Sequence, residues 1–102
     1  MIKTIYQECI DIVKNLVGNE YLYFDSAVEI KVSPHSFPFA AWAVSVSPKN
    51  ELFVMDNNEQ WHLVELTDDH ASLVIGSLYQ RLKLMRIQYA KANSYVLKKQ
   101  IS

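Results

Sequence analysis

The sequence has little of several residue types that mark particular classes of protein. It contains a single cysteine, Cys9, so no intramolecular disulfide and no cysteine-based metal cluster can form within it. Its two glycines, Gly18 and Gly76, stand far apart, which excludes a glycine-rich phosphate-binding loop. No stretch approaches the roughly 20 apolar residues of a membrane span, and polar residues interrupt the first positions, where a signal peptide would need an apolar core. We therefore expect a cytoplasmic protein that uses no membrane, metal or cofactor.

Net charge is also small, and hydrophobic residues are abundant. The 102 residues carry a formal net charge of −1, and 50% of them are hydrophobic. High apolar content with low net charge is the reverse of a disordered composition. A chain of this length builds one core, so residues 1–102 are expected to form a single domain.

The spacing of apolar residues predicts two helices that flank a run of short strands. Apolar residues recur at intervals of three and four along residues 2–17, and Gly18 fits the left-handed residue that ends a helix. Residues 21–24 could extend this helix or begin a strand. Alternation with a period of two follows from Ala27 to Val32. The remaining expected elements are strands at 40–47, 51–56 and 60–66 and a helix over 67–97.

Short connections determine how these strands pair. Pro48 lies at the second position of a turn that begins at Ser47, and residues 56–59 tolerate turn geometry. Loops this short force antiparallel neighbours. The sequence therefore predicts an α+β fold, a two-layer sandwich with an N-terminal helix, an antiparallel meander of three to four strands and a long C-terminal helix. Thr67 would cap that last helix, and Gly76 would lie inside it and permit close packing.

The long helix has more apolar surface than one sheet can cover. On a helical wheel, the stripe expected to face the sheet comprises Val74, Leu78, Leu82, Met85, Tyr89, Ala92 and Val96. A second stripe, roughly opposite the first, comprises Leu73, Leu84, Ile87 and Tyr95. The first helix could cover this second stripe, or it could be open to a partner.

The sheet has a similar excess of apolar residues. In the strand at 40–47, alternation predicts that Trp42 faces the helices together with Val44 and Val46. The next strands are apolar on both faces. We expect Phe53 and Met55 to lie on the face away from the helices, where a second copy of the chain could cover them.

The small net charge conceals a division between the two parts of the chain. Residues 1–69 hold four lysines and all eleven carboxylates, a net charge of −7, and residues 70–102 hold six basic residues and no acid, +6. The basic residues could be a solvated helix surface that pairs with the acidic part. They could instead face nucleic acid. The basic residues concerned are Arg81, Lys83, Arg86, Lys91, Lys98 and Lys99.

Two segments hold residues that could carry chemistry or recognition. His62, Glu65 and His70, with Asp68 and Asp69, are the densest set of acid–base groups, but strand alternation turns His62 and Glu65 to opposite faces. We expect neither a metal site nor catalysis there. The loop over residues 33–39 could form an aromatic recognition surface or plug the edge of the sandwich. Its candidate residues are His35, Phe37 and Phe39.

The leading interpretation is a small cytoplasmic protein-interaction module without catalytic activity, with a second copy or another protein as its partner. Its candidate interface residues are Leu73, Leu84, Ile87, Tyr95, Phe53 and Met55. The alternative is a nucleic-acid-associated accessory protein that uses the basic C-terminal helix. A third hypothesis, an enzyme centred on His62 and His70, has the least support.

Overall fold

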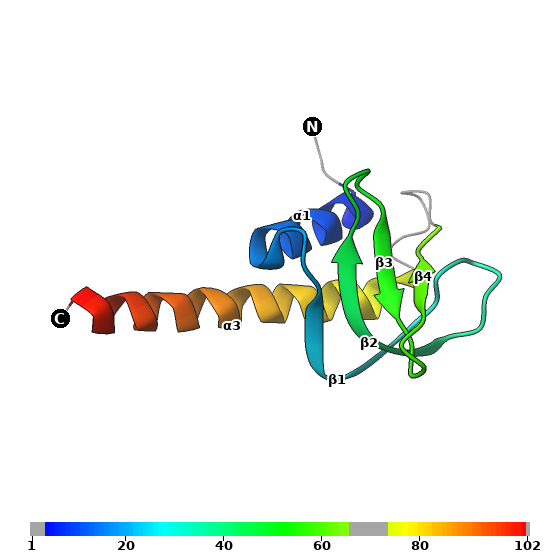
Figure 1. Cartoon of the computed structure of the whole chain (residues 1–102). Coiled ribbons are helices and arrows are strands. Elements are labelled where there is room, and N and C mark those ends of the chain that lie inside the picture. The colour runs from blue at the N-terminus through cyan, green and yellow to red at the C-terminus, as the bar shows by residue number, and fades with distance from the viewer. Residues whose placement is uncertain (1–3, 66–73, 102) are drawn as a thin grey trace.

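The computed structural model of the chain is a sheet with two helices packed on one face (Figure 1). It describes residues 4–65 and 74–101, and only the backbone of residues 89–101. The element order is helix, four antiparallel strands, long helix, which confirms the α+β class.

Helix α1 spans Ile5–Val17 and has a cap at each end. The Thr4 hydroxyl accepts a hydrogen bond from the backbone N–H of Gln7, so the helix begins three residues later than the apolar spacing predicts. Gly18 ends it with a φ of 63° and donates its N–H to the carbonyl of Lys14. The Tyr6 hydroxyl accepts from Leu52 N–H at 3.2 Å and donates to Val64 O at 3.3 Å, which ties α1 to the sheet.

The sheet is the predicted meander, with its strands in the order β1-β2-β3-β4. Asn50 N–H donates to Ser47 O and Glu59 N–H donates to Asp56 O, which closes both predicted turns. Residues 22–24 belong to a strand, which decides the alternative that the sequence left open. The strands are β1 (Leu22–Ile30), β2 (Phe39–Val46), β3 (Leu52–Met55) and β4 (Trp61–Leu63).

The expected facing of Trp42 is wrong. Trp42 is 39% exposed, whereas Ala41, predicted to point the other way, is fully buried in the core. The reason is a register shift between β1 and β2, where Tyr23 pairs with Ala43 but Val28 pairs with Ala41. Residues 24–27 of β1 therefore lie opposite Trp42 alone, and the alternation of β2 changes face at this point.

Helix α3 spans Gly76–Ile101 and packs against the sheet through its first part. Leu78 and Leu82 are fully buried, and Val74 and Met85 pack at the edge of the core, as the first stripe predicts. Tyr89, Ala92 and Val96 of the same stripe lie outside the described side chains, and the predicted N-cap Thr67 lies outside the described residues.

The prediction for Gly76 is wrong. Gly76 is the first residue of α3, and a Cβ added there would meet no atom within 4 Å, so close packing does not explain it. Beyond the sheet, the C-terminal half of α3 extends well past α1 and β1 (Figure 1).

Candidate interaction surface

The face of the sheet opposite the helices carries a group of large apolar side chains. Strand pairing places Tyr23, Ala43, Met55 and Trp61 in one row across all four strands. Phe53 lies in the neighbouring row, opposite Ser45 and Leu63. We call Tyr21, Tyr23, Phe53, Met55 and Trp61 the outer-face patch.

The rings of the outer-face patch contact one another. The ring of Tyr21 lies 4.8 Å from that of Trp61 and 6.2 Å from that of Tyr23, measured between centroids. Ala43 sits in the middle of this row and has no exposed surface, as expected where rings cover a small side chain. Tyr21 and Tyr23 are 52% and 60% exposed, and the other members are half-buried. The patch is therefore an apolar surface that remains partly exposed to solvent.

The sequence predicted part of this patch. Phe53 and Met55 lie on the face away from the helices, as expected. Tyr21 and Tyr23 were missed as members because residues 21–24 could have been helical. Their spacing of two would have placed them on one face once this segment was known to be a strand.

Helix α3 presents a second apolar surface. Leu84 and Ile87 are 57% and 52% exposed. Helix α1 packs beside α3, and the Tyr79 hydroxyl donates to the Glu8 carboxylate between them, but α1 leaves both residues open to solvent. Leu73 lies outside the described residues, and Tyr95 lies outside the described side chains.

A hollow between β1 and α3 joins the two surfaces. Tyr23, Asp25 and Ser26 line it from β1, and Leu84 lines it from α3. The Arg81 guanidinium reaches across to Ser26 O and Ser26 Oγ, both at 3.0 Å, and to Asp25 Oδ1 at 3.3 Å. The remaining lining residues are Met85 and Gln88.

The basic residues proposed to meet nucleic acid have different surroundings. Arg81 makes the contacts with β1 just described and lies 5.8 Å from the Phe24 ring centroid. The Lys83 ammonium sits 4.4 Å over the ring of Tyr79. Arg86 is exposed. The side chains of Lys91, Lys98 and Lys99 lie outside the described ones, although their backbone belongs to α3.

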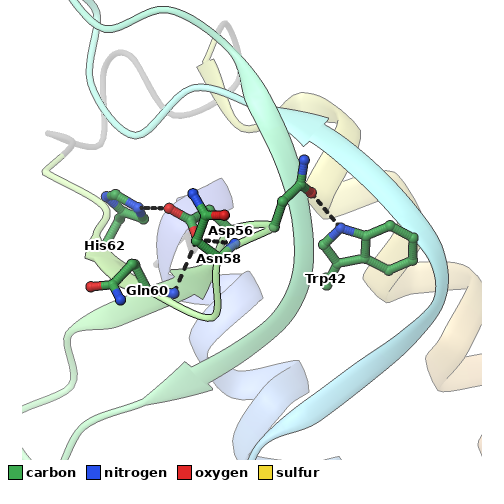
Figure 2. A network of polar contacts seen from close by, with 6 residues as sticks. Trp42, Asp56, Asn58, Gln60 and His62 are labelled. Atoms are coloured by element: carbon green, nitrogen blue, oxygen red, sulfur yellow. Dashed lines mark hydrogen bonds and ion pairs between the residues drawn. The ribbon is translucent and has the colours of Figure 1, made fainter.

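His62 pairs with Asp56, a partner that the sequence did not suggest (Figure 2). Its Nε2 lies 2.6 Å from Asp56 Oδ2, while Asp56 Oδ1 accepts the backbone N–H groups of Asn58 and Gln60 at 2.8 and 3.0 Å. The His62 hydrogen bond is the main cause of an Asp56 pKa below its ordinary value, and the turn N–H groups add to it. The carboxylate thus closes the β3–β4 turn.

Neighbouring aromatic residues complete this region of the sheet. The Trp42 indole N–H donates to Asn57 Oδ1 at 2.6 Å, and the ring of Phe39 lies 4.8 Å from that of His62. Within residues 4–65 and 74–101, no three His, Cys, Asp or Glu side chains could hold a metal ion together. His70, Asp68 and Asp69 fall outside that part of the chain.

The loop before β2 separates its aromatic residues. Ser36 Oγ accepts from Val32 and Ser33 N–H and donates to Ser33 O, which fixes the turn. Phe39 packs against the core, as expected if it fills the edge of the sandwich. Phe37 is 90% exposed, and His35 is also exposed. Recognition by this loop remains a prediction.

Comparison of the chain with protein-family models, with curated proteins and with solved structures finds no match. The described helices include none that is long and apolar enough to cross a bilayer.

Proposed function

We propose that this chain is a cytoplasmic protein-interaction module without catalytic activity, and that it associates with a second copy of itself. The observation that carries the proposal is the outer-face patch, in which five large apolar side chains share a sheet face that neither α1 nor α3 covers. Leu84 and Ile87 extend the exposed apolar surface onto α3. Contiguous apolar surface of this kind marks protein contacts in soluble domains.

The composition of the patch also supports a protein partner. Aromatic residues and methionine are enriched at the centre of protein interfaces, and a Tyr–Trp cluster supplies large buried area with few side-chain torsions to order. A closed two-fold dimer is the commonest soluble assembly. A dimer would cover the same patch on both copies.

The proposal is tested by multi-angle light scattering and sedimentation velocity at micromolar concentrations. We expect wild-type protein to be a dimer and Tyr23→Asp to be a monomer, since a buried unpaired carboxylate opposes the contact. Phe37→Asp is the matched control, because Phe37 is also an exposed aromatic residue but lies in the loop before β2, outside the outer-face patch. A strictly monomeric wild-type protein would overturn the proposal.

Nucleic acid is the alternative partner, because residues 70–102, which include the basic helix, hold no acid. Titration with mixed DNA and RNA at low salt decides between the two. Nucleic-acid binding that weakens steeply as salt rises, by a protein that stays monomeric, would favour the alternative.

A further inference from the structure

The exposed side of β1, together with the two residues before it, is acidic and aromatic. Glu20, Tyr21, Tyr23, Asp25 and Glu29 are all exposed, and we call them the β1 acidic face. Residues 15–30 contain these three carboxylates and no basic residue. In the described part of the chain, Glu20 and Glu29 form no ion pair. The exposed rings of Tyr21 and Tyr23 and the carboxylates of Glu20 and Glu29 are complementary to a partner surface that is apolar and positively charged.

Helix α3 presents an apolar and positively charged surface. Leu84 and Ile87 are exposed apolar residues, and Arg86 is exposed between them. The helix carries six basic residues and no acid over its length. Its C-terminal half extends beyond the sheet (Figure 1). A helix as short as this projecting half is only marginally stable in water without packing partners. A partner that accepts a basic amphipathic helix would stabilise it.

Resting on the proposed function, we infer that α3 from Leu84 onward docks on the β1 acidic face of a second copy, and that a two-fold axis makes the same contact twice. Within one chain, basic and apolar residues of α3 already contact acidic and aromatic residues of β1. Arg81 contacts Asp25 and Ser26, and Leu84 lines a hollow with Tyr23. Each copy offers both surfaces, as an isologous dimer requires.

Charge favours this arrangement over the competing ones. Two α3 helices packed on each other would juxtapose basic residues with no acid between them, and like charges at such positions destabilise a helix pair. Nucleic acid on this helix would meet the carboxylate of Asp25, which lies beside Arg81. A second copy matches acid to base at both contacts.

The test exchanges the charges in two separate variants. One carries Glu20→Lys and Glu29→Lys, so that both surfaces are positive; the other carries Arg86→Glu and Lys91→Glu, so that α3 from Leu84 onward loses its net positive charge. We expect each alone to dimerise at least about tenfold more weakly than wild type, because each removes the charge complementarity of both contacts. An equimolar mixture should recover a dimer, since both contacts between unlike variants are complementary. Native mass spectrometry identifies this heterodimer by mass.

The control variant carries Glu59→Lys and Glu65→Lys, the same charge change at exposed residues outside the β1 acidic face. It should dimerise like wild type, and circular dichroism should show that all variants are folded. A wild-type dimer that neither charge reversal weakens would overturn this inference and leave self-association standing. A monomeric wild-type protein would overturn both. Loss of nucleic-acid binding in the helix variant without any change of oligomeric state would assign α3 to the alternative partner and overturn the inference.

Discussion

Cys9 shows how the core determines the chemistry of one residue. It lies on α1 with no exposed surface, and burial, aided by the nearby Glu8 charge, raises its pKa to about 12. The thiolate is the reactive form of cysteine, so the native side chain is both inaccessible and protonated. The helical spacing of the apolar residues around Cys9 accounts for this burial.

We expect Cys9 to react with Ellman's reagent at pH 8 at least about 1,000-fold more slowly than free cysteine, because the thiolate fraction is that much smaller. Since the pKa is raised, the native rate should keep rising with pH toward 12, whereas free cysteine levels off above about 8.5. Absorbance at 412 nm measures both. Protein in guanidinium chloride is the control and should react at once. A native rate close to that of free cysteine would contradict this account.

The Asp56–His62 pair shows what residue patterns do not reveal. The sequence grouped His62 with Glu65 and His70 because they are close along the chain. Its actual partner sits across a turn, and the geometry of that turn, with Glu59 at a φ of 61°, brings the carboxylate and imidazole together. A positive φ at a glutamate is rare, so no residue preference pointed to this arrangement.

At the scale of elements, the two faces of α3 contribute differently to the free energy of unfolding. Leu82 is fully buried against the sheet, and Leu84, two residues further along, is 57% exposed. Removing a buried leucine side chain loses its transfer free energy and leaves a cavity, whereas an exposed one loses little. This contrast separates the face of α3 that stabilises the fold from the exposed face that we propose binds a second copy.

We expect Leu82→Ala to lower the free energy of unfolding by about 2–5 kcal/mol and Leu84→Ala by less than about 0.5 kcal/mol. Both variants replace the same residue in the same helix, so differences in helix propensity cancel. Urea unfolding followed by circular dichroism, at a concentration low enough to keep the protein monomeric, measures both. Equal losses would mean that the assignment of the two faces is wrong.

Periodicity predicted the existence and order of these elements, since one-sided burial imposes a period of 3.6 on helices and 2 on strands. It failed where the period is broken. The register shift between β1 and β2 turns Trp42 outward, and no residue in the alternating run from Phe39 to Val46 signals that change. The outer-face patch was predicted on β3 but missed at Tyr21 and Tyr23, whose segment could have been helical, and at Trp61 on β4.

For the whole molecule, both shape and charge differ between the two ends of the chain. The compact part contains α1, the sheet and the start of α3, and the rest of α3 leads away from it (Figure 1). All eleven carboxylates lie in residues 1–69, and all six basic residues of the remaining chain lie on α3. If the proposed self-association stabilises the projecting part of α3, the stability of the whole chain depends on protein concentration.

We therefore expect the thermal midpoint of the full chain to rise with protein concentration, because unfolding of a dimer is coupled to its dissociation. A chain ending at Gln88 keeps every residue of α3 whose side chain the structure describes as buried, and it loses Lys91, Lys98 and Lys99. Its midpoint should match that of the full chain within about 2 °C at submicromolar concentration and should not change on concentration. Differential scanning fluorimetry over a hundredfold concentration range gives both curves. A shortened chain that melts far lower even when dilute would show that the distal part of α3 stabilises the monomer, and that the division between core and projecting helix is drawn in the wrong place.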